Sequence, residues 1–396
     1  MRRLSRSGAS IPACRAVAPA SVLAGLAAVS ILALAGPALA ANPKLENELQ
    51  SVLAVFLAEN GVAPGVSACA VCPRLGLDWA GAAGTAARGD PAPLTPRHTF
   101  RIASNTKTYV ATAVLKLVEA GRLGLDDPLR RHLTAEQIAL LESDGYDTAA
   151  ITLAQVLSHT AGLADHTDDP RFEEAIVNDP AHQWTREEQL RRLVEWRDPV
   201  GKPGERYKYS DSGYVLLGGL VERLAGRPLG PAVRELAGFA GLGLTVTYWE
   251  QMEEPPAAAG PRAHQYLGDA DVTSWNPSLD LYGGGGIVTD VRELTLFMRA
   301  LLKGRVLARD TTLGAMTGRG TADYRLGLMA VDFDGRVGFG HQGFWNTFAF
   351  HVPSLDLTVG GCVLNHDAVN GRDLARRLIA AVAAASADGS PHRSSR

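Results

Sequence analysis

The sequence predicts a mixed α/β fold of the α+β kind, with one sheet assembled from the two ends of the chain. Two strand patterns lie near its beginning and three near its end, whereas the residues between them are typical of helices and long loops. The chain has 396 residues, of which 46% are hydrophobic and 20% charged, and this suffices for a large core. The helical block would form a lobe beside the sheet, and a functional site is expected in the cleft between them.

The beginning of the chain differs from the rest. Residues 1–15 contain four arginines and no acidic residue, an apolar run follows, and Ala38–Ala40 has the small-x-small form of a signal peptidase site. Residues 1–40 are therefore predicted to be a signal peptide that is cleaved before Ala41. Pro19 and the shortness of the apolar run disfavour the alternative, an uncleaved membrane anchor. We expect a periplasmic or secreted protein with no stable membrane span after cleavage.

Cleavage would also change the charge of the protein. The intact chain has a formal charge of −3 at pH 7, and loss of the four arginines makes it −7. A mildly acidic exported protein is a poor partner for nucleic acid or for an anionic membrane surface. The expected partner is therefore a small-molecule or peptide substrate.

The first predicted elements are a helix, two strands and a second helix. Residues 42–61 have the pattern of an amphipathic helix that Asn42 can cap. Strands are predicted at 66–71 and 78–85, joined by a turn that contains proline and glycine. The second helix is predicted over about 104–121.

The middle of the chain, about 129–282, is predicted to be helical, and the end is rich in strands. Asp290 would cap a further helix, and Glu293 would complete a capping box. Three strand patterns separated by turn residues occupy 335–366, as in an antiparallel meander. A helix over 371–385 closes the fold.

Three cysteines would remain after cleavage: Cys69, Cys72 and Cys362. An odd number leaves at least one thiol unpaired. Cys69 and Cys72 have the spacing of a redox or zinc pair, but no second pair exists and the surrounding residues are typical of a strand. Residues three apart on a strand point to opposite faces, which suits neither chelation nor a direct disulfide. A structural role is therefore favoured.

A candidate nucleophile lies at the start of the second predicted helix. Ser104 and Lys107 are three residues apart, so on a helix they share one face. A serine hydroxyl attacks when a base takes its proton, and a lysine whose pKa is lowered can be that base. The N–H groups of the first turn would stabilise a developing oxyanion. The alternative is a capping serine and a solvated lysine.

Two further candidate elements lie later in the chain. Tyr209 and Asp211 precede an apolar helix, where a phenol near two ammonium groups can ionise and act as a base. The alternative is that this segment only caps the helix and packs against it. His341 and Gly343 lie near the end of a strand pattern, where a donor side chain can bind substrate and a glycine lets the backbone approach closely. Their alternative is an exposed edge histidine and a turn glycine.

The three elements S-x-x-K, Y-x-[ND] and H-x-G occur in this order, and the chain resembles the serine β-lactamase and penicillin-binding-protein superfamily. It is similar to the branch of class C β-lactamases, D-alanyl-D-alanine carboxypeptidases, D-aminopeptidases and related esterases. The stretches FRIASNTKT, YSDSGYVLLGGLVE and GHQGF carry the resemblance. It implies a five-stranded antiparallel sheet with flanking helices and an all-helical lobe. The implied parts are a catalytic domain over 41–385, with an α/β lobe at about 44–128 and 283–385 and a helical lobe at about 129–282, and a mobile tail at 386–396.

The resemblance also implies roles for individual residues. Ser104 would be the acylated nucleophile, Lys107 would take or relay its proton, and Tyr209 would act as general base and as acid toward the leaving group. The backbone N–H groups of Ser104 and Phe344 would form the oxyanion hole. The substrate-binding residues would be Gln342, Gly343, Phe344 and Tyr282.

The implied activity is that of an exported serine hydrolase of the D-alanyl-D-alanine carboxypeptidase or β-lactamase type, which cleaves an amide or ester bond through an acyl-enzyme. The substrate would be a peptidoglycan stem peptide, a β-lactam or another small molecule. An esterase, a D-aminopeptidase, a transpeptidase and a non-catalytic binder of cell-wall peptides are the alternatives. The resemblance implies no metal and no organic cofactor.

Two implied catalytic residues depart from the family pattern. His341 stands where many relatives carry lysine, and Asp211 stands where they often carry asparagine. An ionised carboxylate only accepts hydrogen bonds, whereas an amide also donates them. Beside Lys107 this carboxylate would keep the lysine charged and shift the base role to Tyr209.

The strand motif HQGF departs as well. Gln342 and Phe344 bring no hydroxyl to a place where relatives that bind a substrate carboxylate often use one. Arg325 and Arg336 are the candidates for an alternative carboxylate partner. Phe344 and Trp345 indicate an apolar surface, which suits an ester or a non-standard peptide.

Other motifs give no site of their own. By the resemblance, His159 belongs to a structural turn, and His166 lies among acidic residues without a convergent metal-binding partner. The glycine run 283–286 lacks the strand and helix context of a dinucleotide site. The resemblance makes the first and last strands neighbours, which predicts a cross-strand disulfide or a shared buried thiol cluster between Cys362 and either Cys69 or Cys72.

Overall fold

A computed structural model describes residues 42–388 of the chain. The predicted signal peptide at 1–40 and residues 389–396 of the predicted tail lie outside this part. Within it, no helix combines the length and the apolar character needed to cross a membrane. The last helix, α12, covers Gly371–Asp388 and so continues past the predicted domain end at 385.

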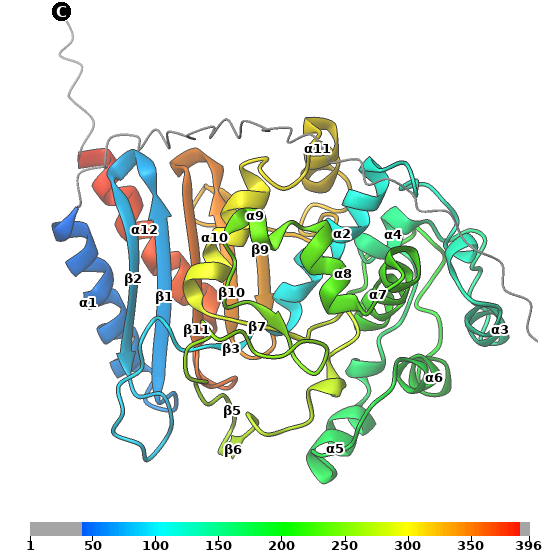
Figure 1. The fold of residues 1–396 in the computed structure, drawn as a ribbon, viewed down its shortest axis with the longest axis horizontal. Coiled ribbons are helices and arrows are strands. Elements are labelled where there is room, and N and C mark those ends of the chain that lie inside the picture. Colours follow the sequence, from blue (N-terminus) through cyan, green and yellow to red (C-terminus); the bar gives the residue numbers. More distant parts are fainter. Residues whose placement is uncertain (1–41, 389–396) are drawn as a thin grey trace, which may run out of the picture. The chain divides into compact units, whose positions relative to one another are not determined.

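A six-stranded antiparallel sheet in the order β2-β1-β11-β10-β9-β8 forms the centre of the fold (Figure 1). Early and late strands pair directly, because β1 lies beside β11 with Val66 opposite Val363. The expectation of five strands is corrected by β8, a four-residue edge strand paired with β9. The strands are β1 Gly65–Cys72, β2 Leu77–Gly84, β8 Met329–Asp332, β9 Val337–Gly343, β10 Thr347–Val352 and β11 Leu357–Val363.

Helices cover both faces of the sheet, because its central strands are apolar on both sides. Successive strand residues alternate in direction. Accordingly, Ala68 and Phe350 pack with α1 and α12 in one apolar cluster. Their neighbours Cys69 and Ala349 pack with α2 and α10 in another. Figure 1 shows α10 in front of the strands and α12 behind them. These helices are α1 Pro43–Glu59, α2 Thr106–Glu119 and α10 Val291–Leu302.

The residues between α2 and β7 form helices joined by long loops, and α7 and α8 pack against α2. Most of their apolar side chains join the cluster that contains α2 and α10. A smaller separate cluster contains Phe172, Ile176, Trp184, Val272 and Trp275, with Ala103 and Trp345. Short strands interrupt the helices and loops. β3, β7 and β4 form a three-stranded sheet in this order, and β5 pairs with β6. The elements are β3 Phe100–Arg101, α3 Ala135–Ser143, α4 Leu153–Leu157, α5 Pro170–Asn178, α6 Arg186–Trp196, α7 Asp211–Ala225, α8 Leu229–Leu236, α9 Phe239–Leu242, β4 Tyr248–Trp249, β5 Tyr266–Leu267, β6 Ala270–Asp271, β7 Ile287–Thr289 and α11 Asp310–Gly318.

Two helix caps form as predicted, and one capping box does not. The Asn42 side chain accepts a hydrogen bond from the N–H of Leu45, and the Asp290 side chain accepts one from Glu293. The Glu293 carboxylate does not close the expected box but accepts from the N–H groups of residues 245–247. A buried carboxylate gains more from several donors than from one, and here it ties α10 to the segment before β4.

The three described cysteines are buried and free. Cys69 and Cys72 lie in apolar clusters on opposite faces of the sheet, as predicted. Cys362 shares the cluster of Cys69 but lies opposite Ser67 in the register of β1 and β11. The predicted neighbourhood of the strands is therefore confirmed, whereas the predicted disulfide is wrong. Burial raises the pKa of Cys69 to about 12, so its thiol stays protonated.

Candidate active site

Ser104 lies in a short 3-10 turn, Ala103–Asn105, that leads into α2. Ala103 has a φ of +45°, a left-handed conformation that costs energy for a residue with a side chain. The carbonyl of Ile102 accepts a hydrogen bond from the hydroxyl of Thr347 at 2.9 Å, which fixes the turn against β10. This strained turn holds Ser104 on the wall of a cavity.

Lys107 points from the first turn of α2 toward Ser104. Its Nζ donates to the Oγ of Ser104 at 2.9 Å and to the carbonyl of Gly284 at 2.9 Å, and it forms an ion pair with Asp211. The lysine side chain is fully buried, so the alternative of a solvated lysine is wrong. The serine hydroxyl thus has a nitrogen partner at the distance that lysine-assisted nucleophilic attack requires.

Asp211 supplies the counter-charge for Lys107. Ser210 caps α7 by accepting a hydrogen bond from the N–H of Gly213, so the Asp211 carboxylate is free to reach the lysine. Burial acts to raise the pKa of Asp211, but the adjacent Lys107 ammonium reverses this effect and lowers the pKa. Asp211 is therefore ionised at neutral pH.

Tyr209 lies beside this charged pair. The Lys107 ammonium is 5.0 Å from the centre of its ring, and the ring of His159 packs against it at 4.3 Å. Burial and then the charge of Asp211 raise the pKa of Tyr209 well above its ordinary value, although a hydrogen bond with Ser104 acts in the opposite direction. The expected ionised phenol between two ammonium groups is therefore not formed, and Tyr209 keeps its proton.

His341 lies beside Tyr209, with the centres of the two rings 6.2 Å apart. It is fully buried, its Nδ1 donates to the carbonyl of Gln342, and its Nε2 accepts from the hydroxyl of Tyr324 at 2.8 Å. Burial and the charge of Lys107 lower the pKa of His341 to about 3, so the imidazole is neutral at physiological pH. His341 itself does not line the cavity, and its role as a catalytic or substrate-binding group stays a prediction.

The end of β9 forms one wall of the cavity, which Gln342, Gly343 and Phe344 line as predicted. Gly343 is required for a contact within the protein and not for the expected approach to a ligand. A Cβ at this position would clash with the carbonyl of Ile102, so the glycine lets β9 approach the turn that carries Ser104. Ser104 and Phe344 line the same cavity, and the oxyanion hole formed by their backbone N–H groups stays a prediction.

Three residues singled out from the sequence lie away from the cavity. Tyr282 donates its hydroxyl to the carbonyl of Trp184 at 2.8 Å and does not line the cavity, so its predicted substrate-binding role does not hold. Arg325 and Arg336 bind backbone carbonyls elsewhere. Within residues 42–388, no arginine or lysine therefore contributes to the cavity wall.

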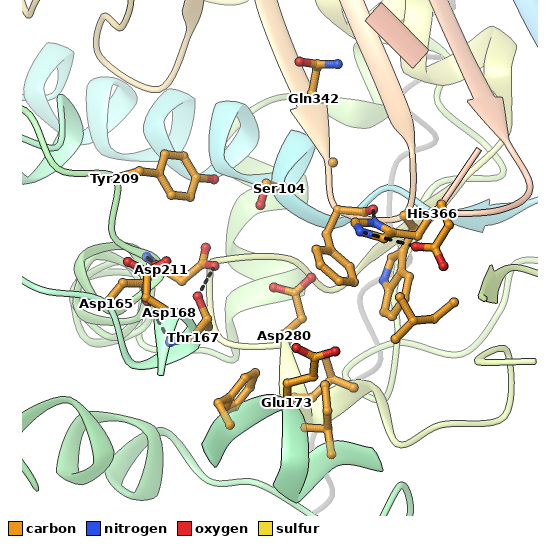
Figure 2. A pocket seen from close by; sticks show the side chains of 18 of the residues that line it. Ser104, Asp165, Thr167, Asp168, Glu173, Tyr209, Asp211, Asp280, Gln342 and His366 are labelled. Carbon is orange, nitrogen blue, oxygen red and sulfur yellow. Dashed lines mark hydrogen bonds and ion pairs between the residues drawn. The ribbon is translucent and has the colours of Figure 1, made fainter. Parts of the chain in front are cut away.

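The cavity has a volume of about 710 Å³ and is rich in acidic side chains (Figure 2). Sequence reasoning missed most of them, because no motif marks Asp280 or Glu173, and the acidic stretch around His166 suggested only a metal site. Among the described residues, no three His, Cys, Asp or Glu side chains are grouped so that they could hold a metal ion. The acidic residues that line the cavity are Asp165, Asp168, Glu173, Asp211, Asp280 and Asp367.

A serine in contact with a buried lysine, beside a protonated tyrosine, is the arrangement of a serine hydrolase site. The model of the beta-lactamase family matches residues 51–385, and the chain belongs to this family. This confirms the resemblance to the serine β-lactamase and penicillin-binding-protein superfamily, whose members include amidases, esterases and penicillin-binding proteins.

Relatives and solved structures agree with this assignment. PbpX of Bacillus subtilis (strain 168), provisionally named a penicillin-binding protein, is 27% identical to this chain over the matched part. The match covers 59% of this chain and 54% of the length of PbpX. Penicillin-binding protein 4 of Amycolatopsis lactamdurans is 29% identical over 66% of this chain and 70% of its own length. The crystal structure of a D-stereospecific amidohydrolase from Streptomyces sp. has a TM-score of 0.70 and 28% identity, and the match covers 83% of this chain and 97% of the amidohydrolase.

Proposed function

We propose that this protein is a serine hydrolase that cleaves amide or ester bonds through an acyl-enzyme on Ser104. The observation that carries the proposal is the 2.9 Å hydrogen bond between Lys107 Nζ and Ser104 Oγ at the wall of a large cavity. A buried lysine in contact with a serine hydroxyl is the partner that nucleophilic attack needs.

In the proposed reaction, Oγ of Ser104 bonds to the substrate carbonyl carbon while its proton passes to Lys107, whose ammonium in turn gives a proton to the Asp211 carboxylate. The backbone N–H groups of Ser104 and Phe344 stabilise the oxyanion. Tyr209 gives its proton to the leaving nitrogen or oxygen as that bond breaks, and the lysine pair returns a proton to Tyr209. Water then attacks the acyl carbon, the bond to Oγ breaks, and the serine regains its proton.

The cavity favours an amidase or esterase over a carboxypeptidase or β-lactamase. A terminal carboxylate needs a cation or free hydroxyl donors. Residues 42–388 bring no arginine or lysine to the cavity wall, and the Thr167 hydroxyl on that wall already donates to Asp211. His341, at the position of the family lysine, is neutral and buried. The similarity to a D-stereospecific amidohydrolase supports an amide substrate. Export through the predicted signal peptide, and hence a periplasmic or secreted location, is part of the proposal.

A labelling and turnover experiment tests the function. A fluorophosphonate should add its mass to the intact protein, and Ser104→Ala should abolish the label. Turnover of phenylalanine amide, short-chain p-nitrophenyl esters, nitrocefin and a D-Ala-D-Ala peptide then identifies the bond. We expect amide and ester cleavage. Preference for the last two substrates would favour the carboxypeptidase or β-lactamase alternative, and labelling that survives in Ser104→Ala would refute the mechanism.

A further inference from the structure

The Asp280 carboxylate faces the cavity without a protein partner. Among residues 42–388, no group donates a hydrogen bond to it or forms an ion pair with it, although it is partly buried. Burial and then the charge of Asp211 raise the pKa of Asp280 to about 7. A buried carboxylate without a counter-charge is costly, so its presence at a reaction cavity indicates a ligand that supplies the charge.

A glycine run makes room for this carboxylate. A Cβ on Gly285 would overlap Asp280, and a Cβ on Gly284 would lie 3.0 Å from an oxygen of Asp280 and 3.0 Å from an oxygen of Asp211. The two carboxylates are therefore neighbours, no more than twice this distance apart. The carbonyl of Gly284 accepts from Lys107 at 2.9 Å, so Asp280 lies close to the group that holds the nucleophile.

The positive charges near the cavity are already paired. Asp211 and Asp168 each have a lysine partner. Glu173 on α5, by contrast, forms no side-chain hydrogen bond or ion pair within the described part of the chain. Figure 2 shows Asp280 and Glu173 on the same side of the cavity, below Ser104. Lys107 and Arg101 act on Asp280 from a distance, but within residues 42–388 neither carboxylate has a cation in hydrogen-bond or ion-pair contact.

Apolar side chains surround these two carboxylates. Phe172 and Ile176 lie on the same helix as Glu173, and Leu279 directly precedes Asp280. All of them line the cavity. Apolar surface beside an uncompensated negative charge is complementary to an amine that carries a hydrocarbon side chain.

We propose that Asp280 binds a protonated amine of the substrate near the scissile carbonyl, with Glu173 as a second acidic contact. This inference rests on the proposed function and names its substrate class: amides or esters of amino acids that have a free amine and an apolar side chain. The same carboxylates repel a substrate carboxylate at this place.

The test compares substrates that differ only in this charge. kcat/KM is measured for phenylalanine amide and N-acetylphenylalanine amide, each as both enantiomers, with the unchanged protein and with Asp280→Asn. Loss of a charge-assisted hydrogen bond should lower the ratio of free-amine to N-acetyl turnover about 10- to 100-fold.

Two further variants keep the reading clear. Glu173→Gln lies on an exposed helix surface, where folding is not at risk, and should lower the same ratio about threefold. Glu174→Gln is the matched control, because Glu174 is also exposed on α5 but does not line the cavity. It removes the same charge and should leave the ratio unchanged.

The outcomes separate this inference from the proposed function. An unchanged ratio in Asp280→Asn, with fluorophosphonate labelling of Ser104 intact, overturns the inference alone. If the unchanged protein is neither labelled nor active, the proposed function fails. Calorimetry then measures the binding of phenethylammonium to the unchanged protein and to Asp280→Asn, and so tests whether Asp280 binds an amine. Binding to Asp280→Asn should then be at least about tenfold weaker. Equal binding would overturn the inference.

Discussion

Two neighbouring aspartates of the reaction cavity differ in whether a cation contacts them. We call Asp211 with Lys107 the paired end, and Asp280 with Glu173 the unpaired end. At the paired end, burial acts to raise the pKa of Asp211, but the Lys107 ammonium lowers it. At the unpaired end, Asp280 is in contact with no cation of the described residues, and burial with the charge of Asp211 raises its pKa to about 7 although Lys107 and Arg101 act against this rise. The two carboxylates are neighbours around Gly284. The difference therefore comes from pairing and not from location in the molecule.

This contrast assigns different tasks to the two ends. At the paired end, the charge of Asp211 is compensated by Lys107 before a substrate binds, and Lys107 contacts the nucleophile directly. The paired end should therefore control the rate of acylation for every substrate. The charge of the unpaired end is compensated only when a cation enters, so this end should control the choice among substrates.

The largest effect is expected when the paired end is broken. Lys107→Met should lower kcat/KM about 10³-fold for free-amine and N-acetyl substrates alike, because Ser104 loses the group that relays its proton to Asp211. The pKa of Asp211 should rise, since the ammonium that lowers it is gone. Steady-state kinetics with both substrates measure the loss.

Lys303→Met is the matched control for this prediction. Lys303 also pairs with an aspartate, Asp356, at 3.0 Å, but it does not line the cavity. Its loss should leave kcat/KM within about twofold. A loss in Lys107→Met that was confined to free-amine substrates would contradict the division of tasks between the two ends.

A smaller effect is expected from Tyr209. Its pKa is raised well above the ordinary value by burial and by Asp211, so the phenol should act as a proton donor. Tyr209→Phe should lower kcat/KM about 10²-fold for an amide, whose nitrogen must be protonated to leave. A p-nitrophenyl ester should lose much less, because its leaving group departs as an anion.

The neighbouring Tyr207→Phe serves as the control for Tyr209→Phe. Tyr207 is exposed and does not line the cavity, so neither substrate should be affected by its change. Equal losses for amide and ester in Tyr209→Phe would show that Tyr209 positions Ser104 and does not donate a proton.

The paired end could be predicted from the sequence, whereas the unpaired end could not. Ser104 and Lys107 carry a spacing that is meaningful on a helix, and Tyr209 and Asp211 belong to a family motif. Asp280 belongs to no motif. Asp280 stands out because no cation of the described residues contacts its carboxylate, and the contacts of a side chain are visible only in the folded chain.

Strand geometry separates two of the predicted site residues. His341 and Gln342 are successive residues of β9, so their side chains leave the sheet on opposite faces. The Gln342 side chain forms hydrogen bonds with Asn370 and Arg372, whereas the buried His341 ring lies 6.2 Å from the ring of Tyr209. The main strands were predictable from their apolar patterns, but β8 is only four residues long and its pairing with β9 depends on the assembled sheet.

The pH profile sharpens the contrast from the unpaired end. Asp280 must be ionised to attract an ammonium group, and its pKa of about 7 reflects burial, Asp211, Lys107, Arg101 and Asp165. Between pH 7.5 and 6, kcat/KM for a free-amine substrate should therefore fall about sixfold, because Asp280 takes up a proton while the amine, with a pKa of about 8, gains a little charge. Above pH 8 the amine itself loses its charge, so the profile should be bell-shaped.

Two controls accompany this profile. N-acetylphenylalanine amide carries no ammonium group, so its kcat/KM should lack the acid limb near pH 7. Asp280→Asn should remove that limb from the profile of the free-amine substrate. If the limb persists in this variant, it belongs to another group, and Asp280 does not govern substrate choice.

The smallest effect on activity is expected from the hydrogen bond between Tyr324 and His341, which belongs to neither end. Tyr324→Phe removes the hydroxyl that donates to His341 Nε2 at 2.8 Å, and the buried nitrogen is left without this partner. Such a loss should reduce the free energy of unfolding by about 1–3 kcal/mol, measured by urea titration. Because His341 does not line the cavity, kcat/KM should change less than about threefold for both substrates. Because the His341 ring is neutral, the effect of losing this hydrogen bond should not depend on the charge of the substrate. A rise in KM for the free-amine substrate alone would contradict this and would add His341 to the unpaired end.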